Sequence, residues 1–294
     1  MEEGSLQLVL DAKAELGEGP CWDAANKLLY WIDILGQNVH IYNPQLQSDR
    51  VIHVGMYVGC VAVAASGGLI MAADRAFYSL DPVTEQITLV SGLPNEPQGN
   101  RFNDGKCDPA GRFWAGTMPM NGSEAAGSLY RLDAESGVKH IFGSVRCSNG
   151  IAWSPDGSTM YYIDSPTKQV AAFDYDLQTG NIQNRRVAVT IPEGEGVPDG
   201  MTIDQEGNLW IAQWGGWKVS RWDPRDGTQL DTVPVPAEQV TSCAFGGVNM
   251  DELYITTART GLDEEQLMKQ PKAGGLFKVK TTVKGIGNTL FSRS

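Results

Sequence analysis

Short apolar segments separated by polar turns recur along the chain. In the clearest copy, residues 197–211, apolar segments at 201–204 and 209–211 flank a turn that contains Gly207 and Asn208. Apolar runs of this length, bounded by residues that tolerate positive φ, are typical of two β-strands joined in a hairpin. The same order of polar loop, strand, turn and strand recurs in five more places, two of them weaker. These copies span residues 19–33, 60–71, 104–115, 150–164 and 243–255.

The spacing of these six copies predicts the fold. The apolar residues that open the second strand of each copy lie at intervals of 40, 44, 47, 49 and 44 residues; they are Leu29, Leu69, Phe113, Met160, Leu209 and Leu253. Repeats of this length built from short strands are typical of β-propeller blades. The sequence therefore predicts an all-β fold, a six-bladed β-propeller. A pair of β-sandwiches, the main alternative, would not produce one period along the whole chain.

The rest of the pattern completes the blades. A third strand is expected after each pair, at residues 38–42, 76–80, 128–132, 169–175, 218–222 and 275–280. The strand-like residues 6–10 precede the first full copy and are expected to complete the last blade, which removes a free sheet edge. Residues 281–294 are expected to be loosely ordered. Because the repeat fills the chain and no linker interrupts it, residues 1–294 are predicted to form a single domain.

Composition and charge narrow the range of functions. The net charge of −12 argues against a nucleic-acid partner, whose phosphates would be repelled, and is compatible with binding a cation. No apolar run is long enough for a membrane helix, and the acidic start lacks the apolar core of a signal peptide. A cytoplasmic protein without membrane contact, a monomer or weak dimer, is therefore expected. Five cysteines without a CxxC motif favour neither a disulfide framework nor a zinc knuckle.

Polar residues occupy the same position in four of the six copies, just before the first strand. They are Glu18, Asn103 with Asp104, Asn149 and Asp199. The first strand of every propeller blade lines the channel, so these side chains are expected to converge at one end of it. Converging carboxylates repel one another unless a proton or a cation lies between them. Their oxygen atoms suit Ca²⁺, Mg²⁺ or Mn²⁺, with zinc as a further choice, so the pattern predicts a site for one divalent cation in the central channel.

Two interpretations at this position stay open. Three of the polar residues are followed by glycine, and any one such pair is explained as well by a simple turn. The metal site therefore rests on three pairs at one repeat position. Arg101 lies close in sequence to Asn103 and Asp104 of this polar group. Its guanidinium group would bind an oxygen of a substrate or, alternatively, make a surface salt bridge.

Several motifs, in order along the chain, resemble one known family. They occupy residues 16–20, 100–109, 115–118, 148–150, 173–176, 198–201 and 270–275, and they include Asn-Arg-Phe-Asn-Asp-Gly-Lys at 100–106. The sequence resembles the SMP-30/gluconolactonase/luciferin-regenerating-enzyme family along its whole length, most closely its regucalcin-type gluconolactonases. The resemblance implies a six-bladed propeller and a metal-dependent hydrolase that opens sugar lactones such as gluconolactone to the aldonic acid.

The resemblance also implies roles for individual residues. The metal ligands would be Glu18, Asn149 and Asp199. Asp199 would also serve as the catalytic base for the attacking water. Arg101 and Asn103 would bind the sugar lactone, and Asp104 would hold a water beside the metal.

The chain departs from the family pattern after residue 118. Asn121 stands where relatives carry a glutamate that contacts substrate, and Glu124 is the alternative for that contact. The preferred sugar is therefore not implied by the resemblance. Two other functions fit the same scaffold: an esterase or phosphotriesterase-like hydrolase, and a non-catalytic calcium-binding regulatory protein.

Overall fold

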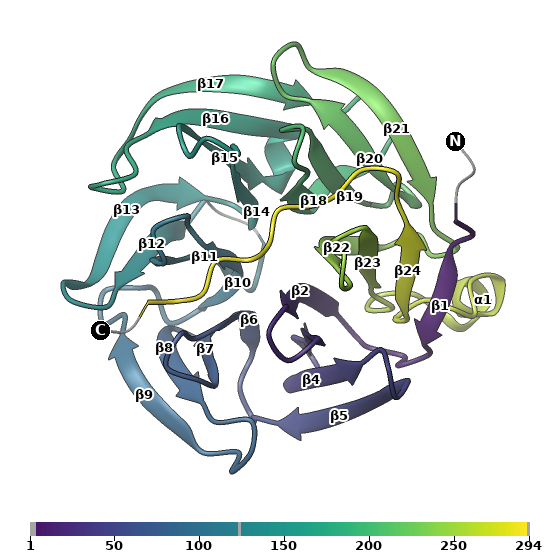
Figure 1. Cartoon of the computed structure of the whole chain (residues 1–294), viewed down its shortest axis with the longest axis horizontal. Coiled ribbons are helices and arrows are strands. Elements are labelled where there is room, and N and C mark those ends of the chain that lie inside the picture. The colour runs from purple at the N-terminus through teal and green to yellow at the C-terminus, as the bar shows by residue number, and fades with distance from the viewer. Residues whose placement is uncertain (1–3, 123–124, 293–294) are drawn as a thin grey trace.

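Six four-stranded antiparallel sheets stand around a central channel in the computed structural model of the chain (Figure 1). The structure describes residues 4–122 and 125–292. It confirms the predicted all-β fold and the predicted six-bladed propeller. None of the helices in the described residues is long and apolar enough to cross a membrane.

Within each blade the strands follow one another from the channel outward, except that the last blade takes its outer strand from the start of the chain. The first blade contains β2 (Gly17–Asp23), β3 (Leu28–Asp33), β4 (Asn38–Asn43) and β5 (Ser48–His53). The second contains β6 (Val58–Val63), β7 (Leu69–Ala73), β8 (Ala76–Leu80) and β9 (Ile87–Gly92). The third contains β10 (Asn100–Cys107), β11 (Phe113–Pro119), β12 (Gly127–Asp133) and β13 (Gly137–Val145).

The second half of the ring repeats this arrangement. The fourth blade contains β14 (Ser148–Trp153), β15 (Thr159–Asp164), β16 (Gln169–Tyr175) and β17 (Ile182–Thr190). The fifth contains β18 (Val197–Ile203), β19 (Leu209–Trp214), β20 (Lys218–Asp223) and β21 (Thr228–Pro234). The sixth contains β22 (Val240–Gly246), β23 (Glu252–Thr257), β24 (Leu276–Lys280) and β1 (Gln7–Leu10). The short helices are η1 (Ser165–Thr167) and α1 (Glu264–Lys269).

The first strand of the chain completes the sixth blade. β1 pairs antiparallel with β24, with Gln7 opposite Lys278 and Leu8 opposite Phe277. This pairing confirms the predicted role of residues 6–10. It closes the ring with hydrogen bonds and covers the edge that β24 would otherwise expose.

In several blades an aspartate stabilises the turn between the first and second strands. In the fifth blade, Asp204 Oδ1 accepts hydrogen bonds from two backbone amides of the turn, at 2.9 and 3.0 Å. Its Oδ2 accepts from Trp210 Nε1 at 3.0 Å and from Arg221 Nε at 2.8 Å. Asp108 binds Trp114 in the same way in the third blade, at 2.8 Å. One carboxylate thus shapes the turn and orients a buried tryptophan of the next strand.

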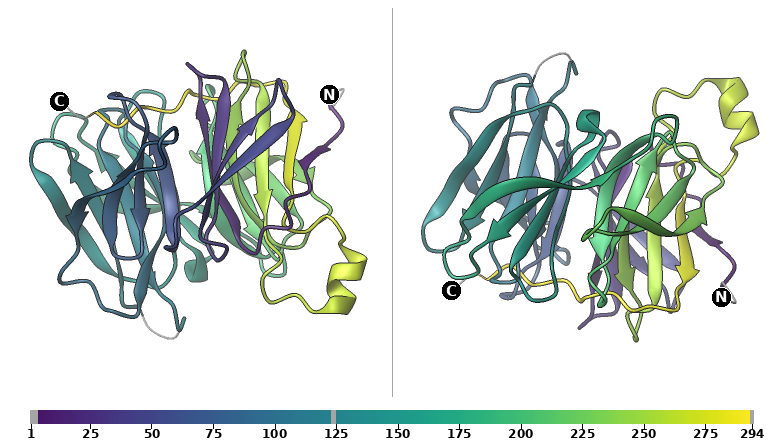
Figure 2. Two further views of the ribbon diagram at one scale, coloured as in Figure 1. Left: turned by 90° about the horizontal axis from the view of Figure 1, so that it is seen from below. Right: turned by 90° about the horizontal axis from the view of Figure 1, so that it is seen from above.

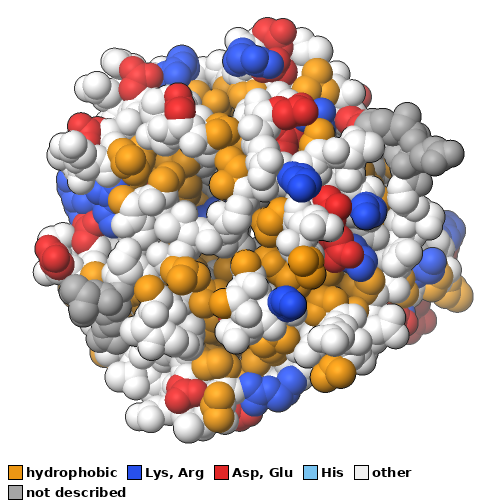
Figure 3. Space-filling model, in the orientation of Figure 1, with side chains coloured by type: hydrophobic (Ala, Val, Ile, Leu, Met, Phe, Trp, Pro, Cys, Tyr) orange, Lys and Arg blue, Asp and Glu red, His pale blue; other side chains and the backbone are white. Residues whose placement is uncertain are grey.

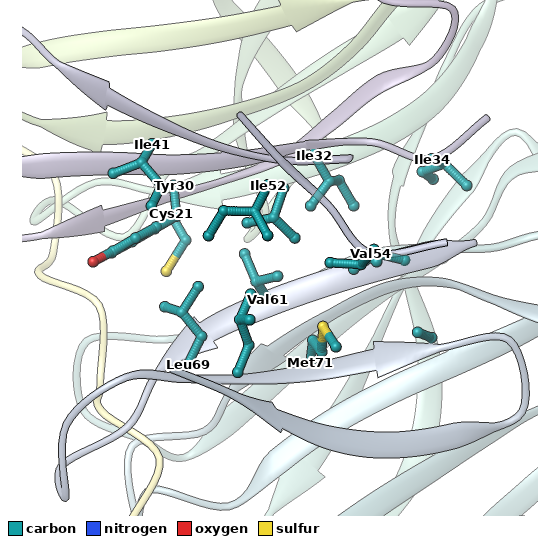
Figure 4. Close-up of a cluster of buried hydrophobic side chains, with 14 residues drawn as sticks. Cys21, Tyr30, Ile32, Ile34, Ile41, Ile52, Val54, Val61, Leu69 and Met71 are labelled. Carbon is teal, nitrogen blue, oxygen red and sulfur yellow. The ribbon is translucent and has the colours of Figure 1, made fainter. Parts of the chain in front are cut away.

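The hydrophobic core lies between neighbouring blades. Figure 4 shows one such layer, where Ile32 and Ile52 of the first blade face Val61, Leu69 and Met71 of the second. Similar clusters of buried side chains fill the other interfaces. Because each blade buries its faces against two neighbours, the radial spacing of the ring is set by this packing.

The segment after β24 crosses the ring. Residues 281–292, here called the C-terminal strap, run over the face of the propeller opposite α1 (Figures 1 and 2). The Phe291 amide donates to the Val63 carbonyl at 2.8 Å, and Asn288 Nδ2 donates to the Trp22 carbonyl at 3.2 Å. Phe291 is 2% exposed. The expectation of a loosely ordered tail is therefore wrong for residues 281–292, because an apolar anchor and backbone bonds fix it.

The strap is expected to contribute measurably to stability. Phe291→Ala removes a buried ring and leaves a cavity, so the free energy of unfolding should fall by about 3 kcal/mol in guanidinium titrations. Leu290→Ala is the matched control, because Leu290 is 44% exposed on the same segment. Its effect should stay within about 0.5 kcal/mol. Equal effects of the two variants would contradict the anchoring role of Phe291.

Candidate active site

Each innermost strand carries a β-bulge at the same repeat position. Between the register pairs that flank it, the inner strand has one residue more than its neighbour. Glu18, Asn149 and Asp199 lie at these bulges in β2, β14 and β18. The repeat pattern predicts them in the loops before the strands, and the structure corrects this to positions inside the strands. A bulge leaves a residue out of the ladder and re-aims its side chain, here at the channel end.

The glycines that follow two of these residues are required by close packing. A Cβ atom on Gly150 would lie 2.8 Å from the Asp199 carbonyl oxygen, and one on Gly200 would lie 2.1 Å from Ser242 Oγ. Both glycines have φ angles outside the positive range. The simple-turn interpretation therefore fails for these two pairs. Their missing side chains let adjacent inner strands approach, which brings Asn149 and Asp199 together.

Three carboxyl groups converge at this end of the channel, as predicted. Glu18, Asp104 and Asp199 are each buried. Burial raises the pKa of Glu18 well above its ordinary value, and the charges of Asp199 and Asp104 add to the shift. Burial and the charge of Asp104 likewise raise the pKa of Asp199, although side-chain hydrogen bonds with Glu18 and Asn149 oppose the shift. The pKa of Asp104 is raised by burial to about 6.

Two buried oxygens in this cluster have no hydrogen-bond partner. Asn149 Nδ2 donates to Ser165 Oγ at 2.9 Å, which fixes the amide and leaves its Oδ1 unpaired. Asp199 Oδ1 is unpaired as well. Leaving a buried acceptor unsatisfied costs about 1–3 kcal/mol, so such atoms in a native structure call for a partner such as a water molecule or a bound ion. Hard oxygen donors of this kind fit a divalent cation.

The metal site itself stays a prediction. Among the described residues, no group of three or more His, Cys, Asp and Glu side chains is placed to hold a metal ion. The predicted ligand set is of a different kind, because it combines Glu18 and Asp199 with the amide oxygen of Asn149.

The two predicted substrate-binding residues of β10 form one unit. Arg101 Nη1 donates to Asn103 Oδ1 at 2.7 Å and to the Phe102 carbonyl at 2.9 Å. Asn103 Nδ2 in turn donates to the Ser148 carbonyl at 2.8 Å. Arg101 is 7% exposed, and the charges of Glu18 and Asp199 act on its guanidinium group. The surface salt-bridge alternative is therefore wrong, because Arg101 is buried against the carboxyl cluster.

Asn121 does not lie on an innermost strand. It is exposed in the connection between β11 and β12, two residues beyond the end of β11. β11 lies beside β10, with Met118 opposite Arg101, so Asn121 is at the rim of the same blade end. Its contact with substrate stays a prediction. Glu124 lies outside the described residues.

The pattern alone did not single out Lys106 and Cys147. Lys106 Nζ donates to the Met201 carbonyl at 2.8 Å, and its charge lowers the pKa of Asp104. It follows Asp104 by two residues on β10, so strand alternation was a usable signal for it. Cys147 Sγ lies 3.7 Å from Asn149 Nδ2 and 3.9 Å from Asn103 Nδ2. A single cysteine gives no comparable signal in the sequence.

Comparison with known proteins identifies the family. Residues 16–259 match the family model described as SMP-30/Gluconolactonase/LRE-like region. The chain belongs to this family. It is 44% identical to regucalcin of Danio rerio over 289 residues, covering 97% of this chain and 98% of that protein. It is 40% identical over 278 residues to the candidate sugar lactone lactonase YvrE of Bacillus subtilis (strain 168), covering 95% of both.

A solved structure agrees with this assignment to the SMP-30/gluconolactonase family. The calcium-binding protein regucalcin of Agrobacterium tumefaciens superimposes with a TM-score of 0.93 at 30% identity, covering 98% of this chain and 97% of that one. The resemblance read from the motifs is thereby confirmed. The six-bladed arrangement is shared along the whole chain.

The carboxyl cluster should make the cation-free protein less stable as the pH rises. In the unfolded chain Asp104 has its ordinary pKa of 3.8, whereas in the folded protein burial raises it to about 6. The unfolded state thus loses the proton first, and stability that is present below about pH 4 is lost as the pH rises through about 6. The raised pKa values of Glu18 and Asp199 extend the loss to higher pH.

Asp199→Asn tests this prediction, because it keeps the shape and removes one charge. In chelator, the variant should melt at a higher temperature than the wild type at pH 8, and at nearly the same temperature at pH 4. Glu135→Gln is the control, since Glu135 is exposed. A stabilisation of Asp199→Asn that persists unchanged at pH 4 would show that charge repulsion is not its cause.

Proposed function

We propose that this protein hydrolyses sugar lactones, opening an aldonolactone such as gluconolactone to the aldonic acid with one divalent cation as cofactor. The observation that carries the proposal is the pair of unpartnered oxygens, Asn149 Oδ1 and Asp199 Oδ1, inside a buried group of three carboxyls. Membership of the SMP-30/gluconolactonase family and 40% identity to the candidate sugar lactone lactonase YvrE support it.

Glu18, Asn149 and Asp199 are the residues that would hold the cation. All three offer oxygen donors, which suit Ca²⁺, Mg²⁺ or Mn²⁺, and zinc is compatible with carboxylate ligands. A bound divalent cation would polarise the lactone carbonyl and stabilise the negative charge that develops on its oxygen. The same charge would favour the ionised forms of Glu18 and Asp199, whose pKa values are raised by burial and by neighbouring carboxyl charges.

Asp199 is the proposed general base. Its carboxylate takes a proton from the attacking water, whose oxygen bonds to the carbonyl carbon of the lactone. The ring C–O bond then breaks, and the ring oxygen takes up a proton to become the hydroxyl group of the open aldonic acid. Asp104 is buried beside Asp199, where its raised pKa fits a group that exchanges a proton or holds the water in place.

Arg101 and Asn103 are the proposed sugar-binding residues. Their mutual hydrogen bond of 2.7 Å fixes the guanidinium and amide groups relative to each other. Fixed donors of this kind suit the several hydroxyl and carbonyl oxygens of a sugar lactone. An apolar phosphotriester would make little use of them, so a lactone is favoured over the phosphotriesterase-like alternative.

The experiment that tests the proposal is hydrolysis of a panel of aldonolactones by chelator-treated protein, with single divalent cations added back. Acid release should require a cation, and Asp199→Asn should lower kcat by about a thousandfold, the usual contribution of a general base. Paraoxon-type phosphotriesters and simple aryl esters are assayed in parallel. Cation binding without turnover of any substrate would favour the calcium-binding alternative, which the name of the Agrobacterium tumefaciens regucalcin also suggests.

Arg101 is expected to act mainly through substrate binding. Arg101→Ala should raise KM about tenfold to a hundredfold with a smaller effect on kcat, because it removes charge-assisted hydrogen bonds to the bound lactone. Arg101→Lys should recover part of the loss. Arg146→Ala is the control, since Arg146 is an exposed arginine two residues before β14. A fall in kcat at unchanged KM would instead place Arg101 in the chemical step.

A further inference from the structure

The first and fourth blades hold the start of their innermost strand in the same way. In the fourth blade, the carboxylate of Asp164 accepts hydrogen bonds from two consecutive backbone amides, at 2.8 and 3.2 Å. In the first blade, Asp33 accepts from two consecutive amides, both at 2.9 Å. The ladder pairs Asp164 with Ser148 and Asp33 with Gly17, so the two carboxylates occupy equivalent positions. In both strands, the residue after this ladder partner is a predicted metal ligand.

The residue that follows each aspartate differs between the two blades. In the first blade it is Ile34, which is fully buried in the hydrophobic layer against the second blade. In the fourth blade it is Ser165, which is buried as well. Both backbones make the same bond, from Ile34 N to the Leu16 carbonyl at 2.9 Å and from Ser165 N to the Cys147 carbonyl at 3.1 Å. The two positions therefore differ in their side chains and not in their backbone placement.

This difference matches the kind of ligand that each blade carries. Glu18 of the first blade ends in two carboxylate oxygens, so either rotation of the group presents an oxygen. Asn149 of the fourth blade ends in one oxygen and one nitrogen, so only one orientation of its amide presents the oxygen. The other orientation would direct N–H bonds at a cation. A ligand amide therefore needs a partner that selects its orientation, whereas a carboxylate does not.

Two acceptors engage the nitrogen of the Asn149 amide. Ser165 Oγ accepts a hydrogen bond from Asn149 Nδ2 at 2.9 Å, and Cys147 Sγ lies 3.7 Å from the same nitrogen. The hydroxyl oxygen is the stronger acceptor, because sulfur accepts hydrogen bonds only weakly. Asn149 Oδ1 is buried and has no partner within the described chain. The hydroxyl of Ser165 thus decides which end of the amide stays available.

We propose that Ser165 is a positioning residue for the candidate cation site. Its hydroxyl group holds the Asn149 amide with Nδ2 turned away from the cation and Oδ1 turned toward it. Asp164 supports this arrangement, because it fixes the backbone that leads into Asn149. The inference deepens the proposed function and rests on its cation site, but it does not depend on which substrate is turned over.

The test is calorimetric titration of chelator-treated protein with Ca²⁺, Mn²⁺ and Zn²⁺ in separate experiments. The cation that the wild type binds at one equivalent is then used for the variants. Ser165→Ala should weaken its binding about tenfold to a hundredfold, the usual effect of losing a group that orients a metal ligand. Thr167→Val is the matched control, because the exposed Thr167 hydroxyl lies in the same turn, η1, and donates to the Asp164 carbonyl. It should leave the affinity unchanged.

A double variant separates orientation of the amide from general structural support. In the background of Asn149→Asp, Ser165→Ala should change the cation affinity by no more than about twofold, because a carboxylate presents an oxygen in either orientation. A merely structural role of Ser165 predicts the same loss in both backgrounds. Equal losses would overturn the proposal, and so would an unchanged affinity of Ser165→Ala in the wild-type background. Circular dichroism and thermal melting confirm that each variant is folded.

Lactone turnover is measured separately on the same proteins. Metal-dependent turnover by the wild type, with a cation affinity that Ser165→Ala does not change, would reject the positioning role and leave the proposed function intact. Cation binding that depends on Ser165, without turnover of any lactone, would support the positioning role and reject the proposed function. A wild-type protein that binds none of the three cations would overturn both.

Discussion

Three buried carboxyl groups repel one another at one end of the channel, and the rest of the structure has to hold them together. Glu18, Asp104 and Asp199 come from three different blades. Burial raises the pKa of each, and neighbouring carboxyl charges add to the shift for Glu18 and Asp199. A loose scaffold would let the blades move apart. The pairing of β1 with β24 and the strap across the opposite face hold the ring closed. The convergence of charge is thus maintained by contacts far from the site.

The bulges are the local means by which the strands present these groups. In β10, the register places Arg101 opposite Met118, Asp104 opposite Gly116 and Lys106 opposite Trp114. Residues opposite each other point to the same side of a sheet, so Arg101, Asp104 and Lys106 share one face. In a regular strand Arg101 and Asp104, three residues apart, would point to opposite faces. The extra residue therefore puts Arg101 on the same face as Asp104 and Lys106.

Much of the fold could be predicted from local pattern, because each blade repeats the same strands and turns. The six blades, their third strands and the closure by residues 6–10 follow from that pattern. The bulges could not be predicted, because the extra residue is defined only by the register with a second strand. The strap was missed for a similar reason: Phe291 is one apolar residue in a polar tail, and its anchor at Val63 is distant in sequence.

The residues of the candidate site likewise divide into those that the sequence predicts and those that only the structure shows. Glu18, Asn149 and Asp199 share a repeat position, so sequence comparison between blades was enough to group them. Lys106 could have been identified only from the alternation of side chains along β10, where it follows Asp104 by two residues. The contact between Cys147 and Met118 depends on how the third and fourth blades pack, and no repeat position contains it. Side chains that act through inter-blade contacts are therefore the part of the site that requires a structure.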